Sequence, residues 1–294
     1  MLYKIYGLII QSEINFQGLK VITNGNPDVY IAYGRVPEKI DGKQVGMSAF
    51  ASPTEFLFDV PGIARYWVKN PSQVIIEKYS GMEDQDVKPF LLNAVFTYLL
   101  VCRDYLVLDG SNVVINGKNV ILCGSSGAGK SALAATFMQN GHYVVSDELT
   151  VIQNIGGKLN QVTSSLPIKV WKDVCIGLNI EHKDLTQVRS SLSKYELPLS
   201  NFNENIRAPI SHIYHINIHN QEQLLFEPKT HLEKISTLVP CTAYYPLIKA
   251  IGKSAIQLKL SMALAAQVKI IKITRPQRYS LKKIIKNIME DLDK

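Results

Sequence analysis

The chain has 294 residues, enough for one large domain or two ordinary domains with real cores. Its hydrophobic content of 46% and charged content of 19% are typical of a globular protein, and no run of about 18 apolar residues predicts a membrane span. The net charge of +7 is not accompanied by an aromatic-rich binding module, so we do not expect a nucleic-acid partner.

The cysteines indicate a reducing compartment. They are scattered and form no C-x-x-C pair: Cys102, Cys123, Cys175 and Cys241. This pattern argues against a zinc site and against a disulfide framework. Because the first residues also lack the layout of a signal peptide, we expect a cytoplasmic protein.

The first part of the chain predicts a β-rich N-terminal domain at residues 1–83. Short β-type runs, separated by turn residues, occur at 29–33, 55–59, 64–68 and 73–77. A boundary is predicted at residues 79–85. The second domain, residues 84–294, then opens with a buried helix from about 87 to 103.

The second domain alternates strands and helices, which predicts an α/β fold. A hairpin turns at Asn116-Gly117, and further strands are expected at 142–145, on either side of Gly156-Gly157, at 213–218 and at 268–273. Helices are expected at 131–140 and 229–238. The polar residues 182–206 predict a long surface loop or lid. A basic amphipathic helix is predicted near the C-terminus, with an apolar stripe at Ile284, Ile285, Ile288 and Leu292.

One stretch fits the phosphate-loop pattern G-x-x-x-x-G-K-[ST] at every fixed position. A buried strand at 119–123 leads into it and the helix at 131–140 leads out. Glycines let the backbone wrap an anion with its N–H groups pointing inward, and the helix start adds partial positive charge. We therefore expect a nucleoside triphosphate to be bound by Gly124, Ser125, Ser126, Gly127, Ala128, Gly129, Lys130 and Ser131.

Within this loop, Lys130 is expected to reach the terminal phosphates and Ser131 to hold Mg²⁺. A second Gly-Lys-Ser occurs at 252–254, but Leu247 stands where the first glycine of the pattern would be. Without that glycine no cradle forms, so we expect no second site there.

Chain geometry locates an acid beside the loop. The helix carries the chain about 15 Å away, at 1.5 Å per residue. Residues 142–147, if extended, return it by about 20 Å. Asp147 therefore arrives beside the phosphates at the carboxyl end of its strand, where a Mg²⁺-binding acid is typical. Glu148 would face the opposite side if the strand continued, so one acid can hold the metal while the other approaches the attacking group.

The phosphate loop, followed closely by Gly141-His142 and Ser146-Asp147-Glu148, resembles HPr kinase/phosphorylase. It is more similar to the HPr-kinase-like proteins of bacteria, some of which phosphorylate the precursor peptides of lasso peptides. The match runs over about residues 99–152, and residues 6–13 and 28–31 also look like that subfamily.

This resemblance implies a P-loop kinase domain of the HPr kinase/PEP carboxykinase type, preceded by a smaller β-rich domain. It implies transfer of phosphate from ATP, with Mg²⁺, to a serine hydroxyl of a peptide or small protein, lasso precursor peptides included. Asp147 would receive or orient the hydroxyl proton, Glu148 and Ser131 would serve the metal, and Lys130 would act on the phosphates. The bifunctional enzymes carry a histidine where this chain has Asp109, so we do not expect the reverse phosphorylase activity.

Other interpretations stay open. Asp147-Glu148 also resembles the acid pair of P-loop ATPases and switches that use water as the nucleophile, and a small-molecule kinase fits the same residues. A binding module without catalysis is a further alternative. Arg189, Lys194 and Arg207 are candidates to clamp phosphate or an acidic peptide. His212 and His215 should point to opposite faces of a strand, so we expect no histidine metal site. The oligomeric state stays open, a homo-oligomer included.

Overall fold

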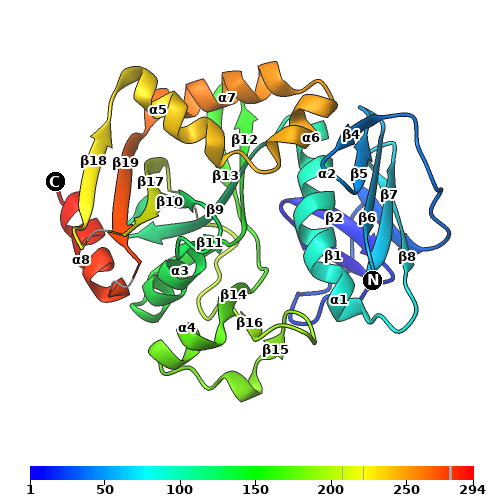
Figure 1. Ribbon diagram of the computed structural model, residues 1–294, viewed down its shortest axis with the longest axis horizontal. Coiled ribbons are helices and arrows are strands. Elements are labelled where there is room, and N and C mark those ends of the chain that lie inside the picture. Colours follow the sequence, from blue (N-terminus) through cyan, green and yellow to red (C-terminus); the bar gives the residue numbers. More distant parts are fainter. Residues whose placement is uncertain (207, 221, 278–279) are drawn as a thin grey trace.

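The computed structural model describes residues 1–206, 208–220, 222–277 and 280–294. Within these ranges the chain is a mixed α/β protein with two eight-stranded sheets and a smaller three-stranded sheet (Figure 1). No described helix is both long and apolar enough to cross a membrane. Arg207, one of the predicted clamps, lies outside the described residues.

The N-terminal sheet uses residues 2–78 and has the strand order β1-β2-β3-β8-β7-β6-β5-β4. The strands predicted at 29–33, 55–59, 64–68 and 73–77 are present, and alternate side chains are buried, as in Ala64, Tyr66 and Val68. The eight strands are Leu2–Ile5 (β1), Leu8–Ser12 (β2), Val29–Tyr33 (β3), Lys43–Val45 (β4), Ala49–Ala51 (β5), Glu55–Val60 (β6), Ala64–Lys69 (β7) and Gln73–Lys78 (β8).

A buried helix links this sheet to the rest of the molecule. It consists of Asp84–Phe90 (α1), a π-helical turn Leu91–Val95 (η1) and Phe96–Cys102 (α2), and it confirms the predicted helix. The π turn begins two residues after Pro89, which has no N–H to donate within the helix. Val87 and Phe96 share one hydrophobic core with the N-terminal sheet, so the packing continues across residue 83.

The second large sheet has the order β13-β12-β9-β10-β17-β19-β18, with β11 pairing to β9. It is mixed: β10, β17 and β19 run parallel, whereas β9 and β18 run antiparallel to their neighbours. The predicted hairpin turn is confirmed, since Asn116 and Gly117 both have positive φ. The strands are Leu106–Ile115 (β9), Lys118–Gly124 (β10), Tyr143–Ser146 (β11), Leu149–Ile155 (β12), Lys158–Val162 (β13), Ile210–His219 (β17), Leu225–Lys229 (β18) and Lys269–Pro276 (β19).

Helices cover both faces of this sheet (Figure 1). Lys130–Gln139 (α3) and Leu281–Leu292 (α8) pack on the face that carries Leu122 and Ile216, and the predicted stripe of α8 is buried there. His231–Leu238 (α5) and Ser254–Gln267 (α7) pack on the opposite face. Short helices Val239–Cys241 (η3) and Tyr245–Ala250 (α6) connect α5 to α7.

The prediction of a long loop at 182–206 is wrong for its middle part. Strands Thr186–Gln187 (β15) and Lys194–Leu197 (β16) form a three-stranded sheet with Ile168–Trp171 (β14). Lys172–Gly177 (α4) and His182–Asp184 (η2) lie between β14 and β15. Polar composition hid these strands: β16 pairs with β14, more than twenty residues earlier in the chain, and the two residues of β15 pair with β16.

Candidate active site

The phosphate loop connects the end of β10 to the start of α3. Gly124 has φ of 142°, and a Cβ at this position would lie 2.3 Å from the backbone oxygen of Ile216 on the neighbouring strand β17. Gly127 and Gly129 also have positive φ. The fixed glycines of the pattern are therefore required by backbone conformation, and at Gly124 also by the close approach of β17.

Lys130 lies at the first position of α3 and folds over the loop. Its Nζ donates to the backbone oxygen of Gly124 at 2.7 Å and to that of Ser125 at 3.3 Å. It also forms an ion pair with Asp109 of β9, at 3.2 Å from Oδ1. The ammonium group of Lys130 is thus surrounded by oxygen atoms of Gly124, Ser125 and Asp109 beside the loop.

Arg275, near the end of β19, contacts the backbone of the phosphate loop. Its Nε donates to the backbone oxygen of Ala128 at 3.0 Å, and its Nη2 lies 3.4 Å from the oxygen of Gly127. The side chain is buried, and this burial lowers the pKa of the guanidinium. No motif in the sequence predicted this contact between Arg275 and the loop.

Asp147 follows β11 directly and lies against the start of α3. Its Oδ1 accepts hydrogen bonds from Ser131 Oγ at 3.0 Å and from Ser111 Oγ at 2.6 Å, and its Oδ2 accepts one from the Lys169 backbone N–H at 3.1 Å. Burial raises the pKa of the Asp147 carboxyl, and nearby Glu148 raises it further, against the opposing effect of these hydrogen bonds.

Glu148 has a different environment from its neighbour. The strand does not continue through the pair: β11 ends at Ser146, and Glu148 has a φ of 64°. Its carboxylate pairs with Lys169 Nζ at 2.6 Å and Lys194 Nζ at 3.6 Å. Burial alone would raise the pKa of Glu148, but the two lysines outweigh it and hold the pKa below its ordinary value.

The donor atoms near Ser131 fit Mg²⁺. This ion prefers oxygen ligands and keeps several waters, with one or two protein ligands beside the substrate phosphates. The Ser131 hydroxyl and the Asp147 carboxylate lie 3.0 Å apart, as such a pair requires. The carboxylate of Glu148 instead contacts lysines. Among the described residues, no group of three or more His, Cys, Asp or Glu side chains could hold a metal by itself.

A cavity of about 310 Å³ opens beside the two acids. Asp147, Glu148 and Lys169 line one side, while Tyr6 and residues 15–17 of the N-terminal region line another. Burial raises the pKa of the Tyr6 hydroxyl, and the charges of Glu148 and Asp147 add to this effect. The N-terminal region therefore forms part of the wall around the acids.

The predicted clamp residues Lys194 and Arg189 make different contacts. Lys194 reaches Glu148, as described above. The Arg189 guanidinium instead lies over the ring of Phe90 in α1, 5.4 Å from its centroid.

Two further residues of the site, Ser111 and Lys169, were not predicted, and Asp109 was named only as the position of a histidine in the bifunctional enzymes. Asp109 and Ser111 interrupt the apolar strand 106–115, and Lys169 interrupts the apolar run 166–171. Ser111 and Lys169 are buried, where a polar side chain without a partner is costly, and they contact Asp147 and Glu148. Asp109 is exposed and pairs with Lys130.

Comparisons with known proteins add little to this geometry. No protein-family model and no curated protein matches the chain. Among solved structures, the chain is similar to the Hpr(Ser) kinase/phosphatase from Coxiella burnetii, with 14% sequence identity over 64% of this chain and 95% of that chain. The TM-score of this superposition is 0.29, which is too low to support an argument about fold or function.

Proposed function

We propose that this protein is a Mg²⁺-ATP-dependent kinase that transfers the γ-phosphoryl group to a serine hydroxyl of a peptide or small protein. The observation that carries this proposal is the hydrogen bond of 3.0 Å between Ser131 of the phosphate loop and Asp147. It joins a triphosphate-binding motif to an acid that lines a cavity. Lasso precursor peptides are among the candidate acceptors, on the strength of the sequence resemblance alone.

The donor side would bind the nucleotide. The backbone of residues 124–130 and the N-terminus of α3 would surround the phosphates, and Lys130 would neutralise charge on the β- and γ-phosphates. Ser131 and one acid of the Asp147–Glu148 pair would hold Mg²⁺, which leaves the other acid free to take the hydroxyl proton. When bound, the metal would supply positive charge beside the phosphates. Arg275 would keep the loop in shape through its two carbonyl contacts.

The transfer itself is a displacement at phosphorus. The serine oxygen forms a bond to the γ-phosphorus while the bond to the β–γ bridging oxygen breaks, and that electron pair leaves on ADP. The hydroxyl proton passes to the carboxylate of Asp147. Its raised pKa suits this role, because a general base works best when its pKa approaches the working pH. Glu148, held by two lysines with a lowered pKa, suits it less.

The main competitor is an ATPase in which water takes the place of serine. The cavity beside Asp147, about 310 Å³, has room for much more than one water molecule, which favours a larger acceptor. A small-molecule kinase would use the same donor side and differs only in what enters the cavity.

The test is to incubate the protein with γ-labelled ATP, Mg²⁺ and serine-containing peptides, and to measure labelled peptide and free phosphate separately. We expect labelled peptide, and loss of label with Lys130→Ala. Phosphate release at a rate that no peptide changes would support the ATPase instead. Normal turnover by Lys130→Ala with nucleotide bound would show that the phosphate loop is not the working site.

A further inference from the structure

The cavity beside Asp147 continues into a much larger one. The second cavity has a volume of about 1030 Å³. Both cavities are lined by Gln17, Pro167, Thr186 and Glu196, so they meet at these four residues. Together they form one groove, which we call the acceptor groove, leading from the catalytic acids to the surface.

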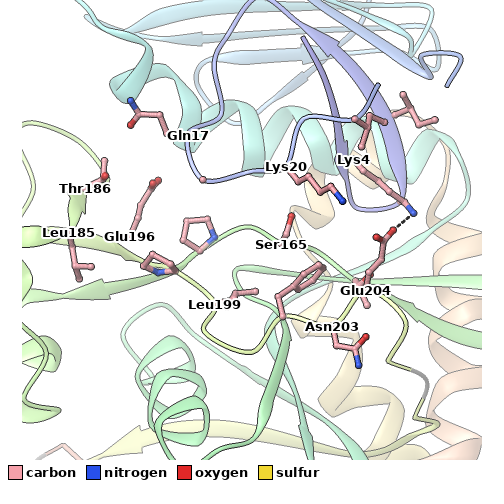
Figure 2. Close-up of a pocket in the computed structure, with 18 of the residues that line it drawn as sticks. Lys4, Gln17, Lys20, Ser165, Leu185, Thr186, Glu196, Leu199, Asn203 and Glu204 are labelled. Carbon is pink, nitrogen blue, oxygen red and sulfur yellow. Dashed lines mark hydrogen bonds and ion pairs between the residues drawn. The ribbon is translucent and has the colours of Figure 1, made fainter. Parts of the chain in front are cut away.

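The acceptor groove runs between two segments that lie far apart in sequence. N-terminal residues such as Lys4, Gln17 and Lys20 form one wall, and residues of segment 163–204 form the other (Figure 2). An ion pair between Lys4 and Glu204 joins the two walls. Near Asp147 and Glu148 the groove is also lined by residues that follow the phosphate loop in the chain. Residues from both the N-terminal region and the second large sheet region therefore contribute to the groove.

The charge of the groove is opposite to that of the whole protein. The chain carries a net charge of +7. Among the described residues, the groove is lined by four lysines, Lys4, Lys20, Lys88 and Lys169. Besides Asp147 and Glu148, it is lined by six carboxylates, Asp28, Glu83, Asp84, Asp184, Glu196 and Glu204. This excess of acids favours a cationic ligand.

Glu196 occupies the junction of the two cavities. It lies on β16, and Figure 2 shows its side chain directed toward the N-terminal wall that carries Gln17. No hydrogen bond or ion pair to its carboxylate occurs among the described residues. Burial raises the pKa of this carboxyl, against the attraction of Lys169 and Lys88. A desolvated carboxylate without a direct partner is stabilised when a cation binds to it.

We propose that an extended peptide binds in the acceptor groove, and that Glu196 selects a lysine or arginine of that peptide close to the phosphorylated serine. This inference rests on the proposed kinase function and adds the chemistry of the acceptor. Both Glu196 and Asp147 line the inner cavity of about 310 Å³. The basic residue and the reacting serine should therefore lie close together in the sequence of the peptide.

The size of the groove favours a peptide over a small molecule. A small-molecule site is typically a single cleft of about 300–1,000 Å³ that buries most of its ligand. The inner cavity alone is large enough for that, so a small acceptor would leave the outer cavity of about 1030 Å³ without a role. An extended chain, rising about 3.3 Å per residue, uses both cavities.

The test is a lysine scan. Short synthetic peptides with a single serine among alanines and glycines carry one lysine at each position around the serine, and matched series carry glutamine or glutamate instead. With the wild-type protein we expect one lysine position to raise kcat/KM for phosphorylation by about ten-fold or more, the effect of a charge-assisted hydrogen bond. The glutamate series should give the poorest acceptors.

Variants then locate the selectivity. Glu196→Gln should remove the advantage of the preferred lysine peptide through a higher KM, with little effect on the glutamine series. Glu196→Lys should shift the preference toward glutamate. The matched control is Glu38→Gln, an exposed acid that lines neither cavity, which should keep the wild-type profile. Circular dichroism of each variant checks that it is folded.

The outcomes separate the two proposals. If peptides are phosphorylated equally well with lysine, glutamine or glutamate, the inference about Glu196 is wrong and the kinase proposal stands. An equal loss on all peptides with Glu196→Gln would also overturn it. If ATP is hydrolysed and no peptide is labelled, the kinase proposal itself fails, and this inference fails with it.

Discussion

The two sides of the Asp147–Glu148 pair are built in different ways. On the donor side, eight consecutive residues form the loop, and Asp109 and Arg275 contact it from elsewhere in the chain. The acceptor side is assembled from the N-terminal sheet region, α1, β14 and β16. The proposed phosphate site is therefore local to one motif, whereas the proposed acceptor site depends on how distant segments meet. Changes on the donor side should lower phosphate release and peptide transfer together, and changes on the acceptor side should alter selectivity or stability.

The largest effect is expected for Lys130→Ala. Loss of a cation that acts on the transferring phosphate typically lowers kcat by about 10²–10³. If the donor side works as a unit, phosphate release to water and transfer to peptide should fall together. Kinetics with γ-labelled ATP measure both. Lys158→Ala, at an exposed lysine that begins β13, is the control and should keep wild-type rates.

Asp147→Asn should lower kcat by about 10², the low end of the effect of losing a general base. Asparagine can keep the local contacts, with its carbonyl facing the Lys169 N–H and its amide facing the two serines. Phosphoryl transfer is measured with Mg²⁺, and nucleotide affinity is measured without it. Slower transfer with unchanged affinity would show that the defect lies in the chemical step and not in nucleotide binding. Full activity of this variant would remove Asp147 from the mechanism.

The same variant tests the environment of Asp147. Because the folded-state pKa of this carboxyl is raised, its ionised form costs stability at every pH above the ordinary value near 3.8. Asparagine never ionises, so without Mg²⁺ we expect its Tm at pH 7 to lie a few degrees above wild type. Differential scanning calorimetry at pH 7 decides this, and a lower Tm would contradict the raised pKa.

Arg275→Gln should have a moderate effect that stays on the donor side. The guanidinium donates to the oxygens of Ala128 and Gly127, and hydrogen bonds that involve a charged group contribute about 1.5–3 kcal/mol each. We expect about a ten-fold weaker affinity for nucleotide, measured by titration calorimetry, together with a lower Tm. Arg275→Lys should recover part of both losses, because it keeps the charge but not the two-atom contact.

The smallest effect is expected for Glu148→Gln, through stability on the acceptor side. The lowered pKa of Glu148 means that its ion pairs add stability above the unfolded value near 4.5, and that this contribution is lost as the pH falls through the folded pKa. Without Mg²⁺, the variant should be less stable than wild type at pH 7, and the difference should shrink below about pH 4.5. Denaturant unfolding across this range measures it; a difference that does not depend on pH would contradict the ion-pair account.

The position of the loop and of most regular elements could be predicted from the sequence. The loop residues 124–131 are recognisable because phosphate binding requires glycines, a lysine and a serine at fixed spacing along one stretch of chain. The strands of residues 29–77, the hairpin turn at Asn116-Gly117 and the buried stripe of α8 follow from local periodicity and turn chemistry. Such signals survive in a single sequence since their causes lie within a few residues.

The remaining contacts could be recognised only in the folded protein. The loop expected at 182–206 contains two strands, of which β16 pairs with β14, and Lys169 and Lys194 reach Glu148. The fold also brings residues 15–17 to the same cavity as Asp147. These contacts join segments separated by twenty to more than a hundred residues, and no spacing in the chain encodes which of them will meet. Burial and strand pairing between distant segments choose those partners.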